Sequence, residues 1–261
     1  MARNEVAPSV RGEPFDKLWT GLSNHERAAL NVNLVVAVHR LRANGQFFQR
    51  LPGVPDTHLS IRQLRRAELP VDTEALARYL IGKSLVHELP HHRLVGRIVE
   101  TEAYVIGDAA GHAFRGQTPR NRSLFLQRGH AYVYFVYGCW FALNVSGETP
   151  GIGAGVLLRA LEPIEGVAQM QTLRGQQKLV DLARGPGRLA MAMAIDRCFD
   201  GVDLCAKGTL WLGAGIRPTG AIGASVRIGL TREVDRKLRF FEHDNAFVSG
   251  PKRLHDQVRP I

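Results

Sequence analysis

The sequence has few cysteines and no long apolar run. Its three cysteines, Cys139, Cys198 and Cys205, match the spacing of neither a disulfide framework nor a zinc ribbon. The ten histidines form no HExxH motif and no zinc-deaminase signature. The longest apolar stretches are far shorter than the roughly 20 residues needed to span a bilayer. We therefore expect no metal, no cofactor and no membrane segment.

Acidic residues are scarcer than basic ones. There are 24 Asp and Glu residues against 34 Lys and Arg, which gives a net charge of +10 and a pI near 10.1. Such a protein is attracted to polyanions, and nucleic acid is the first candidate partner. The opening stretch, MARNEVAPSVRGEP, lacks the apolar core of a secretory signal. We therefore expect an intracellular protein, either cytoplasmic or associated with the nucleoid.

The pattern of the chain changes near residue 70. Residues 1–69 show few strand patterns, and a helix is expected to open at Ser23 or Asn24, so we expect a helical N-terminal extension of unknown role. Residues 70–261 are expected to form the functional domain, beginning with a helix capped by Asp72 or Thr73.

Alternating apolar and β-branched residues then predict the strands of that domain. They are expected at 83–89, 94–104, 130–146 with a break at Tyr137 and Gly138, 155–163, around 210, 225–230 and 238–241. A helical region is expected at 167–195, interrupted at 184–188. The predicted fold class is α+β, in which helices flank a curved, mostly antiparallel sheet within one domain.

The segment RIVETEAY places two carboxylates beside an aromatic ring. On a strand, residues two apart share a face, so Glu100, Glu102 and Tyr104 project together. Glu102 is nearer to the loop at the strand end and is the preferred candidate for chemistry. Glu100 is a candidate for a structural ion pair with an arginine such as Arg97.

Two further segments combine basic and aromatic residues. The loop at 111–122 contains three arginines and no acid, which suits phosphate contact, although a solvated basic loop is an equal alternative. In AYVYFVYG, strand alternation puts Tyr132 and Tyr134 on one face. Tyr134 can therefore line a pocket, and Tyr137 can protrude at a hairpin tip as a wedge in a base stack. Core packing is the alternative for both aromatic residues. The sequence RGPGR at 184–188 opens a helix with glycines beside Arg188, a suggestive anion site that lacks a P-loop ending.

Taken together, these segments resemble the alkyladenine DNA glycosylase family, also called 3-methyladenine DNA glycosylases. The likeness extends over roughly residues 70–250. It is carried by GRIVETEAY at 96–104, QTPRNR at 117–122, YVYFVYG at 132–138, Asn144, VLLRALEP at 156–163 and GPGR at 185–188. It implies that residues 70–261 form a DNA glycosylase domain acting in base-excision repair. Such an enzyme flips a damaged purine from duplex DNA and hydrolyses its N-glycosidic bond, leaving an abasic site. The implied purines are of the 3-methyladenine, hypoxanthine and ethenoadenine class.

The resemblance also implies a role for individual residues. Glu102 resembles the general base that activates water, with Arg159 and the carbonyl of Ile228 holding that water. Tyr137 resembles the intercalating wedge. The walls and floor of the base pocket are implied at Tyr104, His112, Tyr134 and Asn144, the last of which disfavours the amino group of guanine. Phosphate contacts are implied at Arg120, Arg122 and Arg188.

Two other functions are open from the residues alone. The basic charge and the aromatic hairpin would also serve a non-catalytic nucleic-acid-binding module. A carbohydrate glycosidase would need Glu100 and Glu102 about 5 to 9.5 Å apart across a sugar. No lysine lies between Glu102 and Arg159, so a Schiff-base route has no obvious nucleophile and we expect a monofunctional enzyme. We also expect a monomer that acts on double-stranded DNA.

Overall fold

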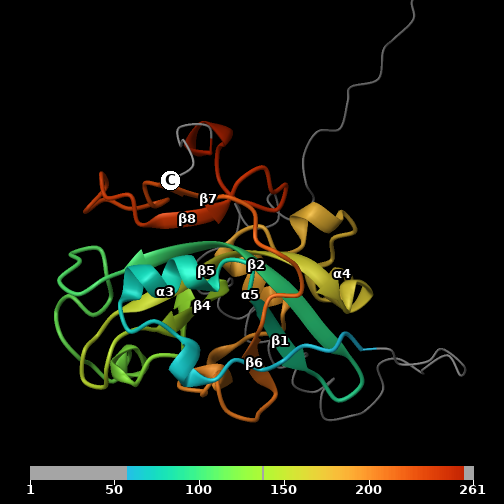
Figure 1. Cartoon of the computed structure of the whole chain (residues 1–261), viewed down its shortest axis with the longest axis horizontal. Coiled ribbons are helices and arrows are strands. Elements are labelled where there is room, and N and C mark those ends of the chain that lie inside the picture. Colours follow the sequence, from blue (N-terminus) through green and yellow to red (C-terminus); the bar gives the residue numbers. More distant parts are fainter. Residues whose placement is uncertain (1–57, 137, 256–261) are drawn as a thin grey trace, which may run out of the picture. The chain divides into compact units, whose positions relative to one another are not determined.

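The long strand β2 (Arg93–Tyr104) organises the sheet, because three other strands pair with it (Figure 1). The structure is a computed structural model that describes residues 58–136 and 138–255. Strand β5 (Gly155–Glu165) pairs along most of β2. Strand β1 (Ser84–Glu88) pairs with its first part, and β8 (Arg239–Glu242) pairs with its last part. Two strands from distant parts of the chain therefore follow one another along β2.

The remaining strands extend this sheet. They are β3 (Ala131–Val136), β4 (Trp140–Ser146), β6 (Leu210–Gly213) and β7 (Ile222–Ser225). The strand order is β3-β4-β5-β2-β1-β6, while β7 pairs with β8. Every strand pair in the described part of the chain is antiparallel. The predicted α+β fold with a curved antiparallel sheet is confirmed.

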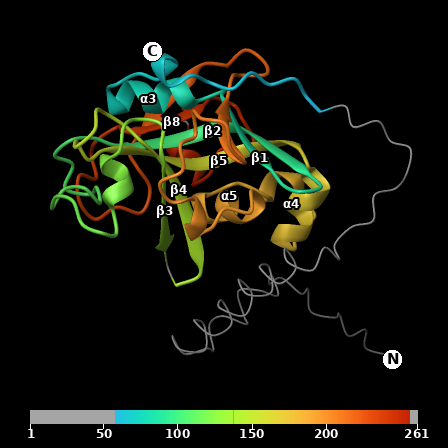
Figure 2. The ribbon, with the colours of Figure 1, turned by 90° about the horizontal axis from the view of Figure 1, so that it is seen from below.

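Within the described residues, three α-helices pack on the sheet. They are α3 (Thr73–Leu80), α4 (Val167–Arg174) and α5 (Pro186–Ala192). Figure 2 shows α3 on one side of β2 and β5, with α4 and α5 on the other side. The side chain of Asp72 caps α3 by accepting a hydrogen bond of 2.7 Å from the amide of Ala75. The predicted start of this helix is therefore confirmed.

Part of the expected N-terminal extension packs with the sheet. Leu64 and Leu69 are buried in the main hydrophobic core, and the amide of Leu64 donates to the carbonyl of Leu212 in β6 at 2.9 Å. Residues 58–69 therefore belong with the folded sheet. The helix expected from Ser23 or Asn24 lies outside the described residues, so its role stays open.

The expected strand at 225–230 is wrong over most of its length. Strand β7 ends at Ser225, and the chain then leaves the sheet. Arg227 turns to an ion pair with Asp108, and the amide of Ile228 turns to Glu102. These polar contacts replace the sheet hydrogen bonds that alternating apolar residues had suggested.

Arg97 does not pair with Glu100 as the sequence interpretation suggested. Residues three apart on a strand point to opposite faces, and buried Arg97 instead contacts Glu242, with 2.6 Å between Nη2 and Oε1. Glu242 also accepts hydrogen bonds from the amide of Gly220 at 2.8 Å and from Asn245 Nδ2 at 2.7 Å. Burial opposes ionisation of Glu242, but these hydrogen bonds outweigh it and lower its pKa to about 2.

This shift predicts an acid-sensitive contribution to stability. The pKa of Glu242 lies near 2 in the folded protein and at 4.5 for the free side chain, so its contribution is complete above pH 4.5 and is lost as the pH falls towards 2. Denaturant unfolding should show that the difference in free energy of unfolding between the wild type and Glu242→Gln shrinks across that range. A difference that does not change with pH would contradict the prediction.

Candidate active site

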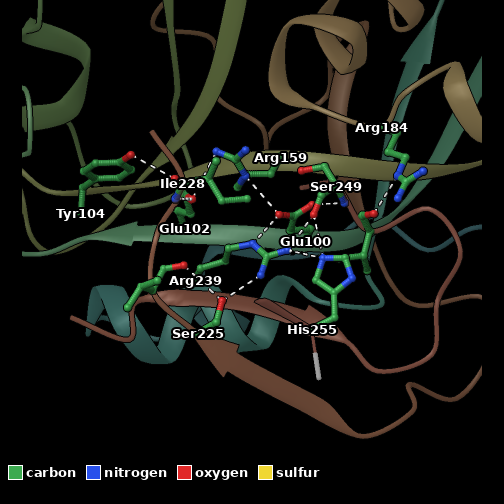
Figure 3. A network of polar contacts seen from close by, with 12 residues as sticks. Glu100, Glu102, Tyr104, Arg159, Arg184, Ser225, Ile228, Arg239, Ser249 and His255 are labelled. Carbon is green, nitrogen blue, oxygen red and sulfur yellow. Dashed lines mark hydrogen bonds and ion pairs between the residues drawn. The ribbon is translucent and has the colours of Figure 1, made fainter. Parts of the chain in front are cut away.

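The carboxylate of Glu102 belongs to a network of polar contacts that also contains Arg159 and Glu100 (Figure 3). Glu102 is fully buried near the end of β2. Its Oε1 accepts a hydrogen bond from the Ile228 amide at 2.8 Å and lies 3.2 Å from Nη1 of Arg159. Its Oε2 accepts a hydrogen bond from the hydroxyl of Tyr104 at 3.0 Å. The structure thus brings together four residues that the sequence selected from three separate segments.

Arg159 links the two buried carboxylates of β2. Its side chain comes from β5, where its Nε donates to Oε1 of Glu100 at 3.1 Å while its Nη1 faces Glu102. Burial alone would lower the pKa of Arg159, but the charges of Glu102 and Glu100 outweigh burial and raise it. Arg159 therefore remains a cation next to the candidate base.

The guanidinium of Arg227 packs against the ring of Tyr104. The guanidinium carbon of Arg227 lies 4.6 Å from the centre of the Tyr104 ring. Arg227 also donates to the carbonyl of Ala103 at 2.9 Å and pairs with Asp108, and the side chains of this pair are fully buried. Burial, and after it the charge of Glu102, raises the pKa of Tyr104, so the tyrosine stays protonated and donates to Glu102.

A cluster of aromatic rings forms a second part of the site. The ring centre of His112 lies 4.5 Å from that of Tyr134, and the rings of Tyr132 and Tyr134 stack with centres 5.3 Å apart. The hydroxyl of Tyr132 lies 2.9 Å from Nδ1 of His112. Burial raises the pKa of Tyr132 to about 12, so this hydroxyl is neutral near pH 7. Sequence reasoning did not select Tyr132, although strand alternation placed it on the same face as Tyr134.

Asn144 is connected to this cluster through the β3–β4 pair. It lies opposite Tyr132 in the register, is buried, and donates from Nδ2 to the Tyr132 carbonyl at 3.3 Å. A cavity of about 630 Å³ lies beside the rings and is lined by His112, Tyr132, much of the loop at 109–121 and residues 229–232. This volume lies within the usual range of small-molecule sites.

A basic hollow of about 470 Å³ is lined in part by Arg159. Its lining contains Arg159, Asp181, Arg184, Gly185, Arg188, Ser249 and Gly250. Three of these seven residues are arginines, and Arg188 is exposed. The glycine-rich turn at 184–188 thus lies beside the candidate catalytic residues, which its distance in sequence did not show.

The other predicted DNA-contacting residues are exposed or lie outside the described residues. Arg120 is exposed and lines the larger cavity, and Arg122 is exposed at the start of a short 3-10 helix, Arg122–Phe125. Tyr137 lies outside the described residues, between β3 and β4. These three roles stay predictions.

The described residues contain no group of three or more His, Cys, Asp or Glu side chains arranged to hold a metal ion. No helix within the described ranges is long and apolar enough to cross a membrane.

Comparison with known proteins identifies the chain. Residues 67–246 match the family described as Methylpurine-DNA glycosylase (MPG). A relative from Mesorhizobium japonicum is 62% identical over 193 residues, which cover 74% of this chain and 93% of the relative. A relative from Paraburkholderia phytofirmans is 53% identical over 196 residues, which cover 75% and 92%. Both relatives carry the name "Putative 3-methyladenine DNA glycosylase".

These matches assign a class and a family. The protein is a DNA glycosylase, a hydrolase of N-glycosyl bonds whose substrate is DNA. Within that class, the chain belongs to the methylpurine-DNA glycosylase family. The resemblance seen in the sequence motifs is confirmed, and an enzyme is favoured over a non-catalytic binding module.

The buried pair of Arg227 and Asp108 should be important for stability. Arg227→Met removes the cation and leaves Asp108 buried without its charge partner, which should lower the free energy of unfolding by about 3–5 kcal/mol. Adding Asp108→Asn removes the unpaired charge and should restore part of this loss. Denaturant unfolding measures both variants, and a double variant no more stable than Arg227→Met would contradict the prediction.

Proposed function

We propose that this protein is a monofunctional glycosylase that flips a damaged purine out of duplex DNA and hydrolyses its N-glycosidic bond with a water activated by Glu102. The reaction leaves an abasic site. The proposed substrates are alkylated or deaminated purines of the 3-methyladenine, hypoxanthine and ethenoadenine class. The observation that carries the proposal is the buried Glu102 carboxylate, held by donors from three segments within a basic fold.

Glu102 is the proposed general base. A positioned carboxylate takes a proton from water as the water attacks the sugar carbon and the base departs. Arg159 and the carbonyl of Ile228 are the proposed partners of that water. Their proximity supports this role, because Arg159 and the Ile228 amide both contact Oε1 of Glu102.

The aromatic residues are the proposed walls of the base pocket. Stacking on an aromatic ring contributes about 1–3 kcal/mol per base, and Tyr104, His112 and Tyr134 offer such surfaces. A cationic alkylpurine gains further from cation–π attraction and is already a good leaving group. Asn144 is the proposed floor of the pocket that disfavours the amino group of guanine. Its amide is held by Tyr132, which would fix its orientation.

The basic surface is the proposed contact with the DNA backbone. Arg120, Arg122 and Arg188 are exposed, as phosphate contacts require. Arg188 lines the same hollow as Arg159, so a phosphate there would lie near the reacting nucleotide. Tyr137 remains the proposed wedge that fills the space of the flipped base. We propose a monomer, because each lesion presents one site.

Two observations weigh against other glycosidic chemistry. Among the described residues that line the two hollows there is no lysine, which disfavours a Schiff-base intermediate with strand cleavage. A carbohydrate glycosidase would need a sugar between Glu100 and Glu102. The guanidinium of Arg159 already contacts both carboxylates, at 3.1 Å and 3.2 Å, and occupies that space.

Replacement of Glu102 tests the proposal. Duplexes containing one hypoxanthine or one alkylated adenine are incubated with wild type and Glu102→Gln under single-turnover conditions. Loss of the general base should slow release of the damaged nucleobase by about 10²–10⁴-fold, while the protein still binds the duplex. Strand breakage should require alkali, which reveals abasic sites.

The control is Glu88→Gln, which removes a carboxylate of the same sheet that lies in β1 and pairs with Arg93. It should release base at the wild-type rate. Undiminished nucleobase release by Glu102→Gln would refute the assignment of Glu102 as the general base. Strand breakage without alkali would refute a monofunctional enzyme.

A further inference from the structure

Glu100 is a second buried carboxylate, and both of its oxygens are already bound. Its Oε1 accepts from Nε of Arg159 at 3.1 Å and from Nε of Arg239 at 2.6 Å. Its Oε2 accepts from the amide of Ser249 at 2.6 Å. The side chain is fully buried. Glu100 thus anchors Arg159, Arg239 and the amide of Ser249, and its role lies in what it holds.

Glu100 fixes the orientation of the Arg159 guanidinium. Arg159 contacts Glu100 through Nε and Glu102 through Nη1. A guanidinium is planar, so contacts at two of its nitrogens fix its orientation, whereas one contact leaves it free to turn. Without Glu100, Nη1 would lose its fixed direction towards Glu102.

Glu100 is itself fixed by a cluster of three residues that we call the C-terminal clasp: Arg239, Ser249 and His255. Nη2 of Arg239 donates to the Ser249 carbonyl at 2.8 Å, and Nη1 donates to Oγ of Ser225 at 2.8 Å. Nε2 of His255 lies 2.9 Å from the Ser249 carbonyl and 3.1 Å from Nη2 of Arg239 (Figure 3). Ser249 and His255 lie beyond residue 246, where the match to the family ends.

We propose that Glu100 is a positioning residue for base release, acting through Arg159, and that the C-terminal clasp keeps it in place. This inference rests on the proposed function of Glu102 and Arg159. Among the described residues, the side chain of Glu100 contacts Arg159, Arg239 and Ser249, and it lines neither hollow. Its loss should therefore slow the chemical step without weakening the binding of damaged DNA.

The test is Glu100→Gln, which keeps the shape of the side chain and removes its charge. Single-turnover release of hypoxanthine from a duplex should slow by about 10²-fold, because a small misplacement of a catalytic group has an effect of that size. Binding of the duplex, measured by fluorescence anisotropy, should be unchanged. A wild-type release rate would overturn the proposal.

Glu242→Gln is a matched control, because it makes the same change in another buried arginine–carboxylate pair of this sheet. Glu242 contacts Arg97 and touches neither Glu102 nor Arg159. It should lower stability but leave the release rate per folded molecule unchanged. An equal loss of rate in both variants would show that any buried charge defect slows the enzyme, and would overturn the proposal.

A double-mutant cycle tests whether Glu100 acts through Arg159. In an Arg159→Met background, adding Glu100→Gln should slow release little further, because the group that Glu100 orients is already absent. Losses that multiply would overturn the proposal. If Glu100→Gln does not fold, Arg239→Lys takes its place, since it keeps the charge but removes Nε, the atom that contacts Glu100. Arg239→Lys should release base more slowly than wild type, and an unchanged rate would overturn the proposal.

These outcomes are separate from a failure of the proposed function. Full activity of Glu102→Gln would remove the base assignment on which the inference rests. An inactive Glu102→Gln combined with a fully active Glu100→Gln would leave the proposed function intact and reject the positioning role alone.

Discussion

The guanidinium of Arg159 lies against two carboxylates that are taken out of water on the same face of one strand. Burying charge is costly, and two adjacent carboxylates would repel each other unless cations compensate them. Arg159 from β5 and Arg239 from β8 supply that compensation. Strands β5 and β8 must therefore both lie beside β2 for the carboxylates to be buried, so the local charge balance and the sheet topology depend on each other.

The sheet provides this arrangement by changing the partner of β2 along its length. Strand β1 pairs with β2 as far as Arg97, and β8 begins to pair at Glu100. The register with β5 also shifts between Ile98 and Thr101. The carboxylates thus lie where one neighbouring strand is replaced by another, and segments from the C-terminal third of the chain can reach them there. The same region accepts the Ile228 amide, the Ser249 amide and the Arg239 side chain.

The site separates its tasks between different parts of the fold. Charge is concentrated at the β2, β5 and β8 contact, whereas the aromatic rings come from β3 and the loop before it. Tyr104 belongs to the charged part, since its ring lies against Arg227 while its hydroxyl donates to Glu102.

Local pattern in the sequence was enough to predict much of the fold. Alternation placed Glu100, Glu102 and Tyr104 on one face and Tyr132 beside Tyr134, and the structure agrees. The cap at Asp72 was likewise readable, because it depends on residues three apart. The strand expected at 225–230 failed because alternation cannot show that Arg227 and Ile228 turn away to satisfy Asp108 and Glu102.

The sequence by itself determined the fold class, the basic charge, the family motifs and the choice of Glu102 and Arg159. The fold class, the charge and the preference for Glu102 depend on residue type and on short spacings, whereas Arg159 was implied by the resemblance to the glycosylase family. Only the tertiary structure decided that Glu100 pairs with Arg159 and Arg239, that Arg227 supports Tyr104, and that Ser249 lies beside the carboxylates. Those contacts join residues between 59 and 149 positions apart. Which distant charges meet is set by strand register and by the cost of leaving buried charges unpaired, and neither is visible in a local pattern.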